Sequence, residues 1–228
     1  MHGTLAIRSI EVKKNLLIGF TGSVASILYE KICKSFYKEY NVKVVMTESS
    51  RQFVNDTVLN DMEIKVFSDY DEFYEPINFV NSTEMVLRLD NKNGRYCNKN
   101  DPILHIQLRD WADCLLIAPC SANTLAKISN GICDNLLTSI VRAWDFSLKK
   151  QLPCNSNKKI IIAPAANCKM WCHPITQEHI DKIGKWGICV IDPVEKKLAC
   201  GETGIGAMAD ISTIVHTVKQ YFSNETEQ

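Results

Sequence analysis

Residues 102–145 read PILHIQLRDWADCLLIAPCSANTLAKISNGICDNLLTSIVRAWD, and this stretch decides the expected fold. A short apolar run, Leu115 to Ala118, is stopped by Pro119 and followed by a polar turn at residues 121–124. Such a run predicts a buried strand, and Ser, Asn and Thr ahead of a periodic segment predict the start of a helix. The stretch therefore predicts a strand–turn–helix unit, with His105 just before the strand.

The rest of the chain repeats this unit. The segment NLLIGF at 15–20 predicts a strand, TGSVAS at 21–26 predicts a glycine-containing turn, and a helix is expected to about Tyr40. Further strands are expected at 42–46, 64–67, 159–163 and 188–191, and further helices from about 51, at 136–144, 174–185 and 211–222. Strands that alternate with helices predict an α/β fold, a Rossmann-like, doubly wound and mostly parallel sheet.

Composition indicates a single domain over residues 1–228, because this length suits one α/β unit. We expect a polar surface insertion at 68–101 and a glycine-rich flap at 197–209. A formal net charge of zero argues against a nucleic-acid partner. No run of 18 apolar residues indicates a membrane span, and the charged start does not resemble a signal peptide, so we expect a cytoplasmic protein.

The ten cysteines are then expected to be thiols, most of them buried. Cys168, Cys172, His173 and His179 lie close together in the sequence, but their spacing matches no common zinc pattern. We expect no metal site.

Four polar turns follow four of the expected strands, at 21–26, 47–50, 121–124 and 165–167. In a parallel sheet these turns share one edge, where ligands bind. The first turn has neither the Gly-Lys-Ser/Thr of a P-loop nor the G-x-G-x-x-G of a dinucleotide site. A mononucleotide with a single phosphate, such as FMN, is the economical interpretation. The alternative is that these residues only cap helices.

Several motifs, in this order, resemble the flavin-dependent cysteine decarboxylases. The resemblance covers about residues 16–208 apart from the insertion. The segments that carry it are TGSVA (21–25), HIQLRDWAD (105–113), APCSANT (118–124), CDNLLT (133–138) with RAW (142–144), PAANCKMW (164–171), and LACG (198–201) with GAM (206–208).

The resemblance implies noncovalently bound FMN in a Rossmann-like subunit, and a homotrimer with sites between neighbouring subunits. It places the FMN contacts on the four turns and on residues beside them. The implied FMN-binding residues are Gly22, Ser23, Val24, Ala25, Thr47, Glu48, Ser49, Ser121, Ala122, Asn123, Thr124 and Ala165.

The implied reaction converts the small-molecule substrate 4′-phospho-N-pantothenoylcysteine into 4′-phosphopantetheine in coenzyme A biosynthesis. The cysteine carboxylate cannot leave without an electron sink, which oxidation of the thiol to a thioaldehyde provides. Loss of CO2 then gives an enethiolate. The implied catalytic residues are His105 as base for the oxidative step, Cys200 as proton donor and Asn167; the implied substrate-binding residues are Asn167, Lys197, Ala199 and Met208.

Ala166 departs from the family pattern, which usually has methionine before the motif's asparagine. Two alternative functions remain. Some relatives are regulatory subunits of a protein phosphatase, and others decarboxylate peptidyl cysteine. The presence of His105, Asn167 and Cys200, together with a short C-terminal tail, favours the enzyme over the regulatory subunit. The matches around His105 and in the flap favour the pantothenoyl substrate over a peptide.

Overall fold

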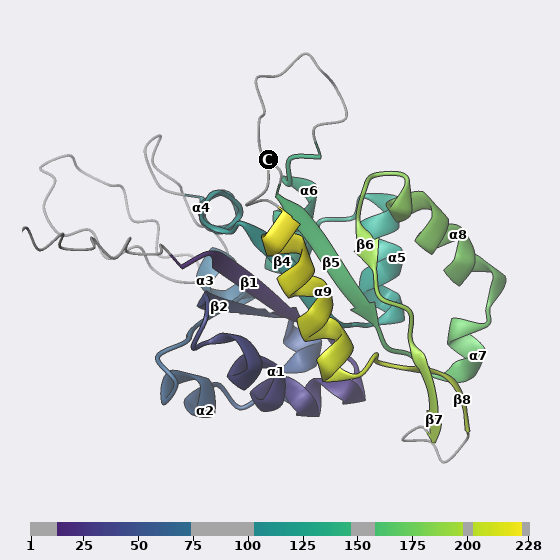
Figure 1. Ribbon diagram of the computed structural model, residues 1–228. Coiled ribbons are helices and arrows are strands. Elements are labelled where there is room, and N and C mark those ends of the chain that lie inside the picture. The colour runs from purple at the N-terminus through teal and green to yellow at the C-terminus, as the bar shows by residue number, and fades with distance from the viewer. Residues whose placement is uncertain (1–12, 74–102, 147–157, 198–202, 225–228) are drawn as a thin grey trace, which may run out of the picture.

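The structure is a computed structural model that describes residues 13–73, 103–146, 158–197 and 203–224 (Figure 1). Its strands are β1 (Asn15–Phe20), β2 (Asn41–Met46), β3 (Lys65–Ser68), β4 (Cys114–Cys120), β5 (Lys159–Pro164), β6 (Cys189–Val190), β7 (Val194–Lys197) and β8 (Thr203–Ala207). Its helices are η1 (Val24–Leu28), α1 (Tyr29–Phe36), η2 (Glu48–Ser50), α2 (Asp56–Asn60), α3 (Asp69–Phe73), α4 (Leu104–Trp111), α5 (Ala122–Asn130), α6 (Leu136–Arg142), α7 (Cys168–Trp171), α8 (Pro174–Gly184) and α9 (Ile211–Asn224).

Six strands form one parallel sheet in the order β3-β2-β1-β4-β5-β6. The chain moves outward from β1 to β3 and returns to place β4 on the other side of β1. In doubly wound sheets, ligands bind outside the carboxyl ends of the strands at this reversal of direction. The crevice between β1 and β4 is therefore the place to look for a site. The predicted α/β fold with a mostly parallel sheet is confirmed.

Helices cover both faces of the sheet (Figure 1). On one face, α1, α2 and α9 bury side chains such as Phe36, Leu59 and Val218 against the strands. On the other face, α4, α5, α6 and α8 bury side chains such as Leu125 and Leu137. The strands are apolar on both sides because both sides are covered. Within the described residues, no helix combines the length and apolar character that crossing a membrane requires.

Local chemistry explains where the helices around the site begin. The Ser121 side chain accepts a hydrogen bond from the N–H of Thr124 and caps α5. Asn135 forms a capping box with Thr138 at the start of α6. Gly131, with a φ of 71°, ends α5 in the left-handed conformation that glycine adopts readily.

Two local expectations need correction. Pro119 does not end the strand, since β4 continues to Cys120 through the cis Ala118–Pro119 bond. The register between β4 and β5 shifts between Ile117 and Cys120, so the sheet does not need the N–H that proline lacks. The expected helix near 51 begins at Asp56 instead.

Residues 69–73 of the expected polar surface insertion form helix α3. The remainder of that insertion, residues 74–101, lies outside the described residues. The expected flap, 197–209, includes the end of β7 and all of β8, which form an antiparallel pair separate from the main sheet. Neither this hairpin nor the short helices α4 and α7 were expected from the sequence.

Candidate functional site

A cavity of about 570 Å³ lies at the carboxyl edge of the sheet. Its volume is within the range of small-molecule sites, roughly 300–1,000 Å³. The turns after β1, β4 and β5 and the second strand of the hairpin contribute most of its lining. The lining residues are Gly22, Ser23, Val24, Ala25, Ile27, Leu28, Ser121, Ala122, Asn123, Ala165, Ala166, Asn167, Met170, Lys196, Gly206, Ala207 and Met208.

The turn after β1 packs tightly against the turn after β2. A Cβ atom on Gly22 would lie 2.5 Å from Ser49 Oγ and 2.7 Å from Ser49 Cβ, so only glycine fits there. Ser23 caps η1 by accepting a bond from the N–H of Ala25. The first turn thus presents a hydroxyl and the start of a helix to the cavity.

Hydrogen bonds join this turn to the turn after β4. Thr21 Oγ1 donates to the carbonyl of Pro119 at 2.8 Å and accepts from the N–H of Ser121 at 2.8 Å. Thr21 is fully buried, so this link is shielded from water. Ser121 Oγ in turn donates to Thr124 Oγ1 at 3.2 Å. Thr124 is buried and supports Ser121 from behind, whereas Ser121 itself lines the cavity.

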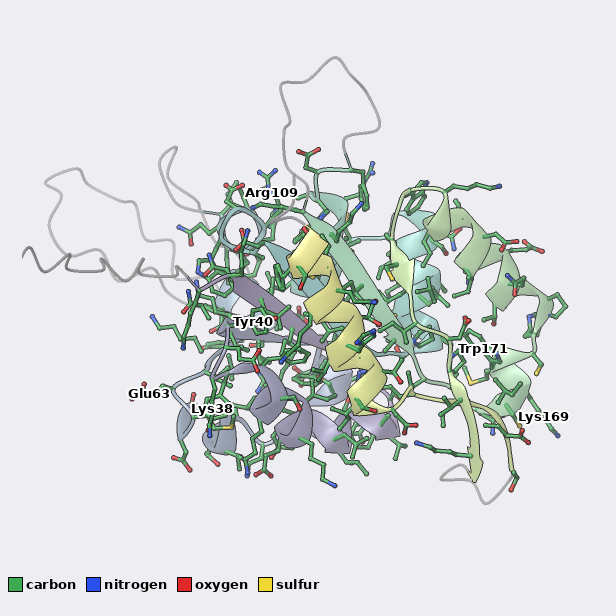
Figure 2. All side chains as sticks on the ribbon, viewed as in Figure 1. Lys38, Tyr40, Glu63, Arg109, Lys169 and Trp171 are labelled. Atoms are coloured by element: carbon green, nitrogen blue, oxygen red, sulfur yellow. The ribbon has the colours of Figure 1, made fainter. Side chains whose placement is uncertain are left out.

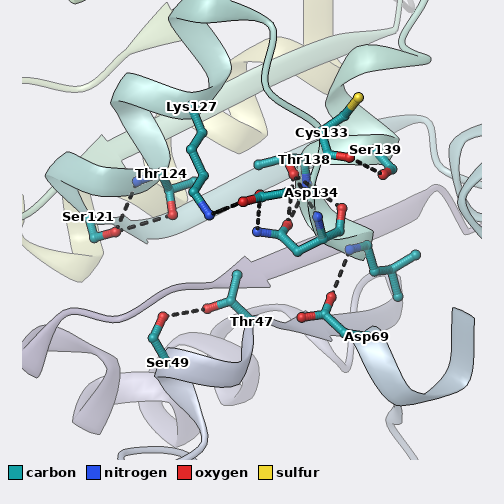
Figure 3. A network of polar contacts seen from close by, with 12 residues as sticks. Thr47, Ser49, Asp69, Ser121, Thr124, Lys127, Cys133, Asp134, Thr138 and Ser139 are labelled. Atoms are coloured by element: carbon teal, nitrogen blue, oxygen red, sulfur yellow. Dashed lines mark hydrogen bonds and ion pairs between the residues drawn. The ribbon is translucent and has the colours of Figure 1, made fainter. Parts of the chain in front are cut away.

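The turn after β2 lies against the turn after β1, but Thr47, Glu48 and Ser49 are not among the described residues that line the cavity. Thr47 and Ser49 share a hydrogen bond of 3.2 Å, and Thr47 also donates to the carbonyl of Phe20. Figure 3 shows this turn opposite the Ser121–Thr124 turn, with the Lys127–Asp134 ion pair beside them. The Glu48 side chain is 78% exposed and pairs with Arg51.

The turn after β5 is held against the hairpin. The N–H of Ala166 donates to the carbonyl of Gly206 at 2.9 Å. Gly206 has a φ of 148°, and a Cβ atom there would lie 2.4 Å from the carbonyl oxygen of Ala166. This close approach places Asn167 and Met208 in the wall of the same cavity.

His105 lies elsewhere in the chain's own fold. It belongs to the first turn of α4 and is not among the described residues that line the cavity. Its Nδ1 atom lies 2.6 Å from Oε1 of Glu72, and its backbone N–H donates to Oε2 of the same carboxylate at 3.1 Å. In Figure 2, Arg109 of α4 lies on the opposite side of the molecule from Lys169 and Trp171 of α7.

Some predicted site residues cannot be placed. Ala199 and Cys200 lie outside the described residues, and of Lys197 only the backbone, at the end of β7, is described. Among the described residues, no group of three or more His, Cys, Asp or Glu side chains could hold a metal ion.

The structure adds lining residues that the sequence analysis missed, notably Ile27, Met170 and Lys196. Lys196 precedes the predicted Lys197 and forms an ion pair of 2.6 Å with Asp210. The position of Lys196 beside the cavity could have been found only by predicting the hairpin. Ile27 and Met170 are apolar and about half exposed, which marks them as cavity-facing rather than core residues.

The residues present fit FMN. Hydroxyls of Ser23 and Ser121, the closely approached Gly22, and the N-terminus of α5 are the groups that bind a phosphate. Val24, Ile27 and Met170 offer exposed apolar surface for a flat ring system. The cavity therefore combines a polar end and an apolar wall, as a mononucleotide with an aromatic ring requires.

Known proteins with similar sequences and folds include phosphopantothenoylcysteine decarboxylases and an FMN binding protein. A probable phosphopantothenoylcysteine decarboxylase of Arabidopsis thaliana is 39% identical over 98% of this chain and 96% of its own. A solved cysteine-to-serine mutant of PPC decarboxylase, complexed with pantothenoylaminoethenethiol, has a TM-score of 0.77 at 37% identity, covering 93% of this chain and all of its own. The solved FMN binding protein AtHal3 has a TM-score of 0.74 at 38% identity, over 93% of this chain and 98% of its own.

Fold and site together define an α/β protein with a nucleotide-cofactor site at the reversal point of its sheet. The sequence matches the Flavoprotein family over residues 6–223. The chain belongs to this family and, within it, to the group of the phosphopantothenoylcysteine decarboxylases. The resemblance to flavin-dependent cysteine decarboxylases is thereby confirmed.

Proposed function

We propose that the chain catalyses the FMN-dependent decarboxylation of 4′-phospho-N-pantothenoylcysteine to 4′-phosphopantetheine in coenzyme A biosynthesis, through a thioaldehyde and an enethiolate. The observation that carries the proposal is the cavity, where three polar turns meet the hairpin beside Asn167. The relatives with this name support the choice of substrate, since the chain spans nearly all of their length.

When bound, FMN supplies the acceptor and the donor of the hydride. The chain's own residues hold the reactants and move protons. Ser23, Ser121 and the turn at Thr47–Ser49 provide hydroxyl groups for the cofactor's phosphate end, and Asn167 offers its amide to the substrate carboxylate or amide. His105 is the base for the oxidative step, and Cys200 gives a proton to the enethiolate.

The position of His105 supports a homotrimer with sites between subunits. His105 does not line the cavity of its own chain in the described residues, yet the reaction needs a base beside the substrate. A neighbouring subunit that brings its α4 to this cavity would complete the site.

The direct test measures CO2 and phosphopantetheine released from 4′-phospho-N-pantothenoylcysteine by the FMN-loaded protein. We expect both products from the wild type. His105→Asn should block the first step, and Cys200→Ser should keep FMN and lose the net product. A normal yield of phosphopantetheine from either variant would remove that residue from its role.

The same assay separates the alternatives. A yellow, FMN-loaded protein that releases no CO2 from this substrate would contradict the proposal and favour a phosphatase-regulating subunit. Release of CO2 from a peptide with a C-terminal cysteine, but not from the pantothenoyl substrate, would favour the peptidyl-cysteine reaction.

A further inference from the structure

We propose that Glu72 is the positioning residue of His105: its carboxylate holds the imidazole with the proton on Nδ1, which leaves Nε2 as the atom that accepts a proton. This inference rests on the proposed function, in which His105 is the base. It assigns a role to a residue in the segment expected from the sequence to be a polar surface insertion.

Both oxygens of one carboxylate contact a single residue. Oε1 of Glu72 lies 2.6 Å from Nδ1 of His105, and Oε2 accepts from the backbone N–H of His105 at 3.1 Å. The Glu72 side chain is only 8% exposed, whereas that of His105 is 27% exposed. The contact is therefore shielded from water, while part of the imidazole still faces outward.

Helix α3 is fixed on three sides, so the Glu72 carboxylate has little freedom to move. Asp69 accepts a hydrogen bond from the N–H of Leu136 at the start of α6. Asp71 accepts from the N–H and hydroxyl of Ser68 at the end of β3. Glu72 contacts the first turn of α4. Three acidic side chains of one short helix thus join it to three different elements.

The geometry selects one tautomer of the imidazole. An ionised carboxylate only accepts hydrogen bonds, so Nδ1 must carry the hydrogen that lies between it and Glu72. In the neutral ring the lone pair is then on Nε2, at the far side from Glu72. A carboxylate that orients a catalytic histidine in this way also stabilises the imidazolium that forms when the base takes up a proton.

Glu72→Gln is the decisive variant, because the glutamine side chain has the shape of glutamate but carries an NH2 donor in place of one acceptor oxygen. The backbone N–H of His105 can only donate, so it retains the single amide oxygen of glutamine. The NH2 group then faces Nδ1 and favours its lone pair, which moves the ring proton to Nε2. Asp71→Asn is the matched control. It alters a neighbouring carboxylate of α3 that accepts hydrogen bonds from Ser68 and does not contact His105.

The first measurement is the nitrogen-15 spectrum of the histidine side chains at mildly alkaline pH, with His105→Asn to assign the signal. We expect the Nδ1–H tautomer in the wild type and in Asp71→Asn, and the Nε2–H tautomer in Glu72→Gln. An Nε2–H signal for His105 in the wild type would overturn the proposal. This readout is independent of any substrate.

The second measurement is the rate of flavin reduction after rapid mixing with 4′-phospho-N-pantothenoylcysteine. Glu72→Gln should slow this step between about 10- and 10⁴-fold with little change in substrate Kd. In a His105→Asn background the same substitution should cost nothing further, because the two residues act as a unit. Additive losses in the double variant would overturn the proposal.

These results distinguish the failure of this inference from that of the proposed function. If the wild type does not reduce its flavin with this substrate, the proposed function fails, and the tautomer measurement still decides the role of Glu72. If the wild type and Glu72→Gln react equally fast while His105→Asn is inactive, the function stands and the positioning role is wrong. Circular dichroism of each variant, with Asp71→Asn alongside, identifies any loss of folding.

Discussion

The turn after β1 can form only because Gly22 has no side chain. Gly22 is held so close to the side chain of Ser49 that even a methyl group would displace one of the two turns. The contact involves the Cβ atom of Ser49, which a change of rotamer cannot move away. The spacing between the first two turns is therefore set by the absence of a side chain.

Gly22→Ala should weaken FMN binding by about 10- to 100-fold, because overpacking of this kind costs roughly 1–3 kcal/mol. Fluorescence titration of the apoprotein with FMN measures the change. Gly184→Ala is the control: Gly184 ends α8 with no atom within 4 Å of the added Cβ. That substitution should leave FMN affinity unchanged and stabilise the helix by up to about 1 kcal/mol. Equal FMN affinity in the two variants would contradict the role of Gly22.

The Asp69 carboxyl should make the stability of the fold depend on pH. Burial raises the pKa of its carboxyl above the ordinary value of 3.8, and the hydrogen bond from Leu136 N–H opposes that shift. The folded chain then binds this proton more tightly than the unfolded chain does. Stability should accordingly fall as the pH rises above 3.8 and the carboxyl ionises in the folded state.

Asp69→Asn should remove this contribution, because the amide oxygen still accepts the Leu136 N–H and carries no charge. Urea unfolding between mildly acidic and neutral pH should show a smaller decline in stability for the variant than for the wild type. Asp61→Asn, at an exposed carboxylate, provides the control. A steeper decline in Asp69→Asn would show that the assigned sign is wrong.

At the scale of elements, the hairpin of β7 and β8 is the part that completes the cavity. Its connection to the sheet edge includes one backbone hydrogen bond, from Ala166 to Gly206, at a point where the two backbones nearly touch. Gly206 also has a positive φ, which a side chain would strain. A side chain at position 206 should therefore disrupt the contact between the hairpin and the turn after β5.

Gly206→Ala should release the hairpin while the turns that hold FMN stay intact. We expect faster hydrogen exchange over residues 203–207 and a KM for the pantothenoyl substrate at least about tenfold higher, with FMN affinity unchanged. Thr203→Ala, on an exposed side chain of the same strand, should change neither quantity. Unaltered exchange in Gly206→Ala would mean that the docking does not depend on this contact.

The elements also show what could be predicted from the sequence. The buried strands carry apolar runs bounded by polar turns, so β1, β2, β4 and β5 were predictable to within a few residues. The hairpin was not, because β7 reads VEKK and β8 reads TGIGA, and neither shows clear alternation. The contact of Glu72 with His105 joins residues 33 positions apart, and no local pattern encodes that pairing.

At the scale of the molecule, the predicted site residues form two groups. The turns after β1, β4 and β5 line the cavity together with the hairpin, because parallel strands end at one edge. Thr47, Glu48 and Ser49 are not among the described residues that line it. His105, the implied base, is not among the described residues that line this cavity, and its helix α4 packs against α3 and α6. Sequence order placed His105 just before β4, but order along the chain does not specify which cavity a side chain serves.

Two inactive variants should therefore restore one another. If His105 serves the cavity of a neighbouring subunit, mixed trimers of His105→Asn and Asn167→Asp chains contain some sites with both residues intact. Co-expression with two affinity tags should yield mixed particles with partial decarboxylase activity and a mass of three times the 25.8 kDa chain. Each variant alone should be inactive. Mixed trimers without activity would assign His105 and Asn167 to the same subunit.

The site has two parts, the turns at the edge of the sheet and the hairpin of β7 and β8. The turns after β1, β4 and β5 directly follow these strands, so the register of the sheet fixes their relative positions. The hairpin pairs only with itself among the described strands. An exchange of residues 194–207 for those of another family member should therefore change the choice of thiol substrate while the turns after β1, β4 and β5 keep their geometry.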